Sequence, residues 1–439
     1  MDVSIFYTME KPGDMIRVTT TKGEYSGILM PQDKEFLVIK LENGYNIGID
    51  RKTIGSIEVL KKYEKKSSPL KEVAQLRELP TISVLHTGGT IASKVDYTTG
   101  GTSAKFSPDE LLSLFPEVVG MANIRSRLVA KIMSENMRFA HYNLLAKEIE
   151  KEIKEGADGI IITHGTDTLH YTSAALSFML ESLTVPVILV GSQRSSDRPS
   201  TDSAINFLSA VNFIVKTDYA GVACCMHESI DDNSCLILPG TKTRKMHSSR
   251  RDSFKAVNAE PIARVDMESN SITFFSNNYQ KRSKATDVRT ILFKEGIKVG
   301  LLKCHTNMYA SEFLAYLGFD GLVLEITGLG QGPFVVFDDA TKEHEKIANA
   351  VKELVKTGTL VAAAPQTIYG RLQMNVYSEG RKTQELGIIG NYNDMTPETT
   401  FIKLAWLLSN HKKEEAAELL LQNLRGELNN RIQDDGYLG

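Results

Sequence analysis

Residues 81–92 read TISVLHTGGTIA, an apolar run that ends in a pair of glycines. Three more runs of this kind follow, namely GIIITHG at 159–165, PVILVGS at 186–192 and GVACCMH at 221–227. Near-continuous apolar runs are typical of strands that are buried on both faces of a parallel sheet. Because helical patterns lie between them, the region from Leu79 onward is predicted to be an α/β domain.

Two segments between these strands carry clear helix signals. In HYNLLAKEIEKEIKEG (141–156), one helical face collects four apolar residues, Leu144, Leu145, Ile149 and Ile153. The segment SPDELLSLF (107–115) starts with a capping box in which Ser107 is the cap and Glu110 completes it. Both patterns support alternation of strands and helices along the chain.

A second α/β unit is predicted after a polar connection at 276–296. Its strands are IKVGLLKC at 297–304, GLVLEIT at 321–327 and TLVAAAP at 359–365. Its helices lie near SEFLAYLG, HEKIANAVKELVKTG and PETTFIKLAWLLSN, and the tail KKEEAAELLLQNLRGELNNRI is a good helix former.

The first 63 residues have a different pattern. Five short β-rich segments, MIRVTTT, GEYSGILM, EFLVIKL, YNIGID and SIEVLKKY, are separated by tight turns. This spacing predicts a small SH3-like or Sm-like β-barrel, followed by a charged linker. The expected division is therefore 1–75 for the barrel and linker, 76–290 for the first α/β domain and 291–439 for the second.

Composition excludes several classes of function. The chain has 439 residues and a net charge of −3, which does not suit a nucleic-acid-binding protein as a whole. Residues 1–75 carry 12 Lys and Arg against 11 Asp and Glu, a net charge of +1 that is weak for an RNA platform. No signal peptide is visible, and no apolar run approaches the ~20 residues that span a membrane.

The four cysteines are Cys224, Cys225, Cys235 and Cys304. They form no CxxC pair, so buried reduced thiols in a cytoplasmic protein are expected.

Polar residues gather where the predicted strands end. In an open α/β sheet, ligands bind beyond the carboxyl ends of the strands. The turns HTGGTIA, MSENM, THGTDT and GSQRSSDRPSTD supply short hydroxyls there, with one carboxylate near Thr166. A phosphate cradle is one interpretation, but the GxGxxG and GxxxxGK[ST] signatures are missing. The residue types favour a small polar substrate.

The motifs TGGTIA (87–92) and HGTDT (164–168) together resemble the threonine-dependent L-asparaginase/glutaminase family. The resemblance implies a two-domain L-asparaginase-like α/β body. It also implies catalytic roles for Thr90 as nucleophile, Tyr97 on the following loop, and a set made of Thr166, Asp167 and Lys245. Substrate-binding positions implied in the same way are Gly89, Ser134, Glu135 and Gly165. Asn307 matches a position that approaches the site of the neighbouring chain, so a homodimer core is expected.

These residue types suit amide hydrolysis. A carboxamide is a poor electrophile, and an acyl-enzyme splits the reaction into two easier steps. A threonine hydroxyl needs a neighbour to take its proton, and burial or nearby positive charge helps a lysine to do so. Arg244, Arg250 and Arg251 could supply that charge. Backbone N–H groups at the glycine turns could stabilise the oxyanion, and the loop at 93–107 could close Tyr97 over the substrate.

Each residue also has a structural interpretation. Thr90 and Thr166 could be helix caps, Asp167 could cap the following helix, and Lys245 could be solvated. His86 and His164 flank the two turns, but without a third ligand they are expected to pack or hydrogen bond, and no metal site is expected.

Over nearly its full length the chain resembles the D subunits of the archaeal Glu-tRNA(Gln) amidotransferases, which couple a small barrel to an asparaginase-like body. Blocks such as LENGYNIGI, RKMHSSRRDSF and PQTIYGRLQMNVYS carry this resemblance. It implies release of ammonia from glutamine or asparagine, in a heterotetramer of two D and two E chains. The E chain would use ATP and Mg and make most contacts with tRNA(Gln), and this chain would bind no cofactor. A stand-alone asparaginase and a non-catalytic scaffold remain as alternatives.

Overall fold

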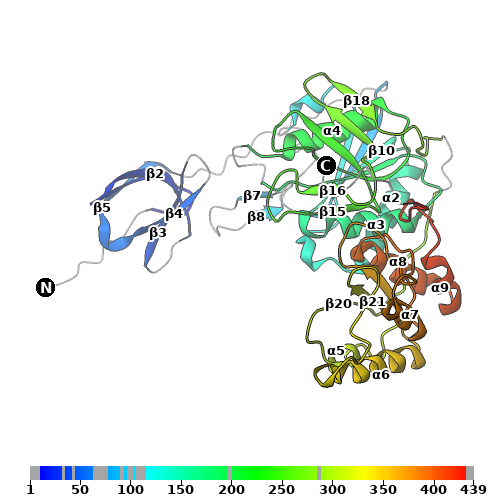
Figure 1. The fold of residues 1–439 in the computed structure, drawn as a ribbon. Helices are drawn as coiled ribbons and strands as arrows, with labels where there is room; N and C mark the ends of the chain where they lie inside the picture. Colours follow the sequence, from blue (N-terminus) through cyan, green and yellow to red (C-terminus); the bar gives the residue numbers. More distant parts are fainter. Residues whose placement is uncertain are drawn as a thin grey trace.

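The computed structural model describes residues 10–31, 35–41, 45–62, 78–88, 93–95, 102–104, 115–194, 200–283 and 288–431. Figure 1 shows them as a small β domain (blue) and a larger body of helices and strands. The body contains an eight-stranded sheet and, further along the chain, a three-stranded parallel sheet.

The N-terminal domain is a five-stranded antiparallel sheet in the order β4-β3-β2-β1-β5. Its strands are β1 Met15–Thr20, β2 Gly23–Leu29, β3 Phe36–Lys40, β4 Asn46–Asp50 and β5 Ile54–Lys61. Alternate side chains of four strands meet in one small core, which contains Ile16, Val18, Leu29, Leu37, Ile39 and Ile49. The predicted five-stranded β domain is confirmed. In the described residues its edge strands, β4 and β5, do not pair with each other.

The large sheet has the order β18-β17-β14-β13-β12-β10-β6-β9. Its strands are β6 Thr81–His86, β9 Asn123–Leu128, β10 Gly159–Thr163, β12 Pro186–Val190, β13 Gly221–His227, β14 Ser234–Pro239, β17 Ala263–Asp266 and β18 Ser271–Phe274. Strands β9, β6, β10, β12 and β13 pair in parallel, and the remaining three extend the sheet with antiparallel pairs. The four apolar runs of the sequence therefore form adjacent parallel strands.

Helices cover both faces of this sheet. They are α2 Phe139–Lys154 and α3 Leu169–Met179 on one face, and α4 Ser203–Lys216 on the other. Strand β10 shows the alternation, because Ile161 belongs to the core with α4, whereas Ile160 and Ile162 belong to the core with α2 and α3. Burial on both faces explains why these strands have no polar alternation.

The order of the parallel strands locates a binding crevice. Strand β6 is first in the chain, β9 pairs on one side of it, and β10 pairs on the other side. Successive strands are thus added on opposite sides of β6, and the switch in strand order lies between β6 and β10. Ligands in doubly wound sheets bind at such a switch point, beyond the carboxyl ends of the two strands.

The C-terminal unit is a parallel sheet in the order β20-β21-β22 with helices on both faces. Its strands are β20 Val299–Lys303, β21 Gly321–Ile326 and β22 Leu360–Pro365. Its helices are α5 Ala310–Leu314, α6 Glu343–Lys356, α7 Ser378–Glu385, α8 Pro397–Asn410 and α9 Lys413–Leu420. Helix α8 packs against α3 of the first domain as well as against β20 and β21. It therefore joins the two units.

Several local predictions differ from the structure. The tail helix is short, because α9 ends at Leu420. Leu144 lies on the exposed side of α2, although the predicted face holds for Leu145, Ile149 and Ile153. The segment at 93–107, predicted as a loop, contains the antiparallel strands β7 Ser93–Val95 and β8 Thr102–Ala104. The capping box at Ser107 lies outside the described residues.

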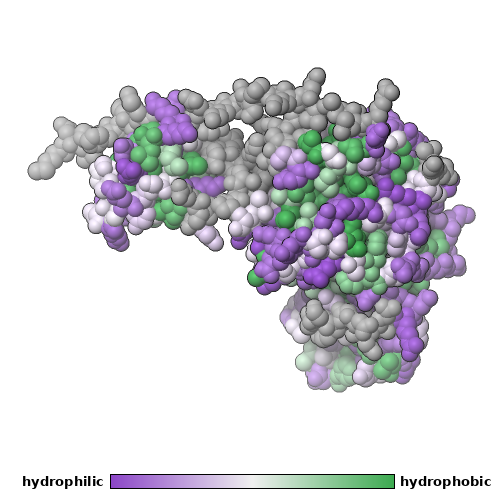
Figure 2. All heavy atoms as spheres, turned by 90° about the horizontal axis from the view of Figure 1, so that it is seen from above, coloured by the Kyte–Doolittle hydropathy of each residue, from purple (hydrophilic) through white to green (hydrophobic). Residues whose placement is uncertain are grey.

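Short strand pairs complete the body. Strand β11 Leu180–Glu181 pairs with β19 Arg289–Thr290, and β15 Thr243–Lys245 pairs with β16 Phe254–Ala256. All four cysteines are free and buried, as predicted. In the part of the chain that the structure describes, no helix combines the length and apolar character needed to cross a membrane. Figure 2 shows hydrophilic residues (purple) interspersed with apolar ones over the visible face of the body.

Candidate active site

The carboxyl ends of β6 and β10 lie side by side. His86 pairs with Thr163 in the parallel register, and the amide and hydroxyl of Thr87 both donate to Thr163 O, at 3.1 and 3.0 Å. The turns that follow these strands therefore begin at one edge of the sheet. Thr166 lies three residues after Thr163, and Thr90 lies three residues after Thr87.

Three predicted residues, Gly89, Thr90 and Tyr97, lie outside the described residues. Gly88, the described residue directly before Gly89, has a φ of +108°. A Cβ at Gly88 would lie 2.5 Å from Ile132 O, and Ile132 N donates to Thr87 O at 2.9 Å. Only glycine tolerates this close approach, which holds residues 87–88 against the segment that leads to Ser134.

Thr166, Asp167 and Lys245 form one contact cluster. Lys245 Nζ donates to Thr166 Oγ1 at 2.8 Å and to Asp167 Oδ1 at 2.7 Å. The side chain of Lys245 is 10% exposed and that of Asp167 is 66% exposed, so the lysine is enclosed while the carboxylate faces solvent. The fold therefore brings Lys245 together with Thr166 and Asp167, from which it is separated by nearly 80 positions in the sequence.

The β15–β16 hairpin places Lys245. In its register Lys245 lies opposite Phe254, which is fully buried. Burial of a side chain of this size contributes roughly 1.5–3 kcal/mol, which fixes the hairpin against the domain. Thr166 starts the 3₁₀ helix η5 (Thr166–Thr168) directly before α3. The cap residue of α3, Thr168, makes no capping hydrogen bond through its side chain, and Asp167 binds Lys245 instead.

Ser134 and Gly165 lie in close contact. Ser134 starts the 3₁₀ helix η4 (Ser134–Asn136) and is buried. A Cβ at Gly165 would lie 2.8 Å from the Oγ of Ser134, and Thr168 Oγ1 donates to Ser134 O at 2.6 Å. Glu135 is exposed beside them. The turn that contains Ser134 and Glu135, which is predicted to bind substrate, thus lies against the turn that contains Thr166.

Asn307 stands apart from this cluster within the chain. It is exposed, has a φ of +61°, and lies in the turn between β20 and α5. In the described residues, no hydrogen bond joins it to Thr166, Asp167 or Lys245. Its predicted role concerns the neighbouring chain and stays a prediction.

Gln193 is a member of the site that the sequence analysis did not single out. Thr166 Oγ1 donates to Gln193 Oε1 at 3.5 Å, a weak contact, and Gln193 Nε2 donates to Ser253 Oγ at 2.6 Å. A Cβ at Gly191 would lie 2.8 Å from Thr166 Cγ2, so the turn after β12 packs directly on Thr166. The position of this turn beyond a buried strand was the available signal.

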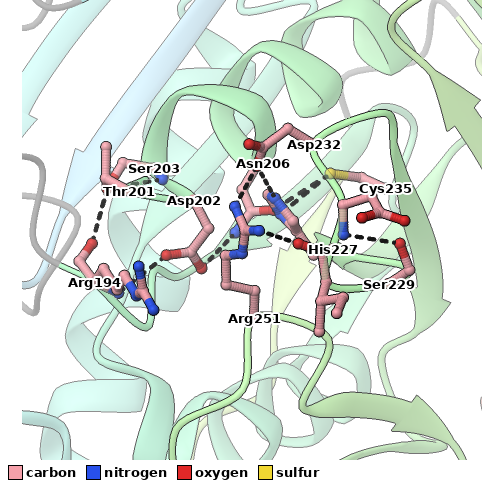
Figure 3. Close-up of polar contacts among 12 residues, drawn as sticks. Arg194, Thr201, Asp202, Ser203, Asn206, His227, Ser229, Asp232, Cys235 and Arg251 are labelled. Carbon is pink, nitrogen blue, oxygen red and sulfur yellow. Dashed lines mark hydrogen bonds and ion pairs between the residues drawn. The ribbon is translucent and has the colours of Figure 1, made fainter. Parts of the chain in front are cut away.

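The buried carboxylate of Asp202 holds this turn. It accepts hydrogen bonds from the amides of Gln193 and Arg194 and from the hydroxyl of Ser192, all at 2.9–3.1 Å. Figure 3 shows how the contacts continue behind the turn, from Asp202 through Asn206 to His227, and then to Asp232 and Arg251. Arg251 lies two residues before Ser253, the partner of Gln193, in the chain.

The two histidines beside the turns are hydrogen bonded within the domain. His86 contacts Thr163 and Ser126 through its two ring nitrogens, both at 2.8 Å. His164 contacts Gly165 O at 2.7 Å and Thr172 Oγ1 at 2.9 Å. Burial lowers the pKa of each to about 4, so both are neutral at pH 7. Their predicted packing and hydrogen-bonding role is confirmed.

The arginines near Lys245 do not provide free positive charge. Each is paired with a carboxylate, Arg244 with Glu398, Arg250 with Asp252 and Arg251 with Asp232. The expectation that they favour deprotonation of Lys245 by their charge is therefore weakened. The pair of Arg244 is unusual among them, because Glu398 belongs to α8 of the C-terminal unit.

Comparison with known proteins accounts for the whole architecture. Residues 10–60 match the family model described as GatD N-terminal domain, residues 81–280 match Asparaginase, N-terminal, and residues 298–421 match Glutaminase/Asparaginase C-terminal domain. The D subunit of glutamyl-tRNA(Gln) amidotransferase from Methanococcus maripaludis (strain C5) is 41% identical over 96% of this chain and 98% of its own length. The protein of the same name from Pyrococcus furiosus is 40% identical, and 97% of each chain is covered. The chain belongs to the family of glutamyl-tRNA(Gln) amidotransferase D subunits.

Solved structures connect this family to asparaginases. The thermostable L-asparaginase from Thermococcus kodakarensis is 27% identical to this chain, with a TM-score of 0.69. The match covers 80% of this chain and 100% of the asparaginase. The D-subunit family therefore combines a two-domain asparaginase-like body with an N-terminal β domain, as the sequence predicted.

Proposed function

We propose that this chain is the glutamine-hydrolysing subunit of an amidotransferase that converts Glu-tRNA(Gln) to Gln-tRNA(Gln). One observation carries the proposal: an enclosed lysine contacts a threonine and an aspartate at the switch point of a member of the D-subunit family. A lysine in contact with a hydroxyl supplies the neighbouring base that amide hydrolysis through a threonine needs.

Each residue has a chemical task in this proposal. Thr90 attacks the side-chain amide carbon of glutamine or asparagine and gives its hydroxyl proton to Thr166, while Lys245, in its neutral form, accepts the hydroxyl proton of Thr166. Asp167 stabilises the ammonium that results. The proton then returns through Thr166 to the amide nitrogen, the C–N bond breaks, and ammonia leaves. Water hydrolyses the ester, and one of its protons restores the hydroxyl of Thr90. Tyr97 closes over the nucleophile. Gly89, Ser134, Glu135 and Gly165 line the substrate position, and Asn307 reaches the site of a second copy.

The remaining parts of the reaction belong to a partner. The E chain of the amidotransferase, in a heterotetramer of two D and two E chains, would activate the glutamyl group with ATP and Mg and hold most of tRNA(Gln). This chain would bind no cofactor or metal and would form the homodimer core of a cytoplasmic complex. The weak net charge of the β domain fits a docking role better than direct tRNA binding.

The test is steady-state ammonia release from glutamine and from asparagine, with the purified chain and with the complex isolated from its host. Lys245→Met should reduce release by several orders of magnitude while the fold survives. Lys245→Arg should not restore it, because a guanidinium does not lose its proton near neutral pH. Substantial activity of Lys245→Arg would show that this residue supplies only charge. Full activity toward asparagine without any co-purifying chain would favour a stand-alone asparaginase.

A further inference from the structure

The strand that carries Lys245 is held from its opposite side by the C-terminal unit. Side chains alternate along an extended strand, so Arg244 points away from Lys245. Lys242 lies in the turn directly before the strand. Lys242 Nζ lies 3.0 Å from Asp394 Oδ2, and Arg244 lies 2.9 Å from Glu398 Oε1. Both carboxylates belong to the C-terminal unit, whereas Lys245 reaches the N-terminal domain.

The first of these ion pairs is a rigid attachment. The side chains of Lys242 and Asp394 are 1% and 0% exposed. Asn429 also donates to Asp394, through its amide at 3.2 Å and its side chain at 2.7 Å. Because both charges are buried and hydrogen bonded, separating them would leave an uncompensated charge inside the protein. Lys242 therefore fixes the start of β15 to the C-terminal unit.

The second ion pair lies directly beside the site. Glu398 is in the first turn of α8, and its side chain is 9% exposed. Burial alone would raise the pKa of Glu398, but the hydrogen bond and charge of Arg244 lower it below its usual value, so the pair is ionised. Both Nε and Nη2 of Arg244 reach the same oxygen, and the other oxygen of Glu398 has no hydrogen-bond partner among the described residues. The orientation of Glu398 thus depends on Arg244.

Helix α8 also packs against the helix that follows Thr166, the partner of Lys245 in the catalytic contact. Helix α8 packs on α3, and α3 begins at Leu169, directly after the 3₁₀ helix that contains Thr166. Helix α8 therefore contacts both the hairpin of Lys245, through Glu398 in its first turn, and the element that follows Thr166. A shift of α8 would change the 2.8 Å contact between Lys245 and Thr166.

From this placement we propose that Glu398, through Arg244, positions Lys245 against Thr166, with Asp394 and Lys242 as the fixed point of the strand. The C-terminal unit would then control the catalytic contact of the N-terminal domain without touching substrate. Arg244 and Glu398 are positioning residues in this scheme, which rests on the proposed role of Lys245 as the base.

Because charged groups surround Lys245, the scheme predicts how the pH dependence of activity changes in the variants. The charged or titratable groups on Lys245's own strand and on the elements packed against it are Asp167, Arg244 with Glu398, Lys255, which lies opposite Arg244 on β16, and His170 on α3, whose pKa burial lowers to about 4. Glu398→Gln leaves the charge of Arg244 unbalanced, which disfavours the ammonium form of Lys245. Arg244→Met leaves Glu398 unbalanced and has the opposite effect.

The experiment measures kcat, KM and the pH profile of glutamine hydrolysis for full-length variants whose folding is checked by thermal unfolding. For both single variants kcat should fall at least about tenfold, with KM within about twofold. The acidic limb of kcat/KM should move to lower pH in Glu398→Gln and to higher pH in Arg244→Met. In the double variant the limb should return toward that of the wild type while kcat stays low, because charge is restored and positioning is not.

Two comparisons make the result decisive. Glu385→Gln breaks an exposed ion pair with Lys382 in the same unit and should change neither kcat nor the profile. Folded Glu398→Gln and Arg244→Met variants with kcat within about twofold of wild type and unmoved limbs would overturn the inference. If Glu398→Gln does not fold, the Arg244→Met variant alone decides, since Arg244 is 24% exposed. An active Lys245→Met variant would instead refute the proposed function.

Discussion

At the scale of single residues, the site depends on close approaches that only certain side chains allow. A Cβ at Gly88 would meet the backbone of Ile132, a Cβ at Gly165 would meet the hydroxyl of Ser134, and a Cβ at Gly191 would meet the methyl group of Thr166. The β15–β16 hairpin places Lys245 in contact with both Thr166 and Asp167. The chemistry of the proposed amidohydrolase is therefore built from short side chains on a tightly packed backbone.

Removing either proposed catalytic hydroxyl tests this chemistry. Thr90→Val and Thr166→Val delete a hydroxyl at nearly constant volume, and each should lower ammonia release by several orders of magnitude. Because the two residues act in one unit, the double variant should be little worse than either single variant. Rates are measured under single-turnover and steady-state conditions. A Thr90→Val variant with near-wild-type rate would refute the assignment of Thr90 as the nucleophile.

Gly165→Ala tests the packing of the turn. The φ and ψ of Gly165, −67° and 142°, suit alanine, so any effect comes from the contact with Ser134. Overpacking of this kind costs about 1–3 kcal/mol, and displacement of Ser134 should also raise KM. The matched control is Gly55→Ala in the β domain, where the nearest atom would lie 3.5 Å away. Equal unfolding free energies and KM values for Gly165→Ala and wild type would contradict this account.

At the scale of elements, α8 packs against both the first domain and the C-terminal unit. Its cap is Thr396, whose hydroxyl accepts from the amide of Thr399 at 3.2 Å, and Pro397 occupies the first helical position. Thr396→Ala should lower the free energy of unfolding by about 1 kcal/mol. It should also lower kcat, because Glu398 lies in the turn that loses its cap. Thr396→Ser keeps the hydroxyl and should preserve both quantities, and chemical denaturation with parallel kinetics provides the comparison.

The sequence predicted elements better than contacts. The apolar runs identified β6, β10, β12 and β13 because strands buried on both faces have a plain signal, and the segment PETTFIKLAWLLSN, near which a helix was predicted, forms α8. The tail helix was overestimated, because helix propensity does not reveal that Glu427 turns back to form a buried ion pair with Lys403. Gln193 and the pair of Arg244 with Glu398 were missed for the same reason. Their partners are distant in sequence, and no local pattern indicates them.

At the scale of the whole molecule, buried histidines make stability depend on pH. Burial lowers the pKa of His86, His164 and His170 from 6.5 to about 4. Between these values the unfolded chain takes up protons that the folded chain does not, so the free energy of unfolding falls as the pH falls. Each histidine contributes about 1.4 kcal/mol per pH unit in this window. His170→Phe should reduce the slope measured by denaturation between about pH 5 and 6.5. An unchanged slope would contradict the burial argument.

The most direct test of the central claim follows the amide nitrogen itself. Glutamine labelled with ¹⁵N in its side chain is incubated with Glu-tRNA(Gln), ATP, Mg and the complex isolated with this chain. The account predicts labelled Gln-tRNA(Gln) with the wild-type chain and almost none with Lys245→Met. The same Lys245→Met complex should form Gln-tRNA(Gln) when ammonium chloride replaces glutamine, because only the supply of ammonia is lost. Label transfer by Lys245→Met at the wild-type rate, or its absence with an intact wild-type complex, would contradict the account.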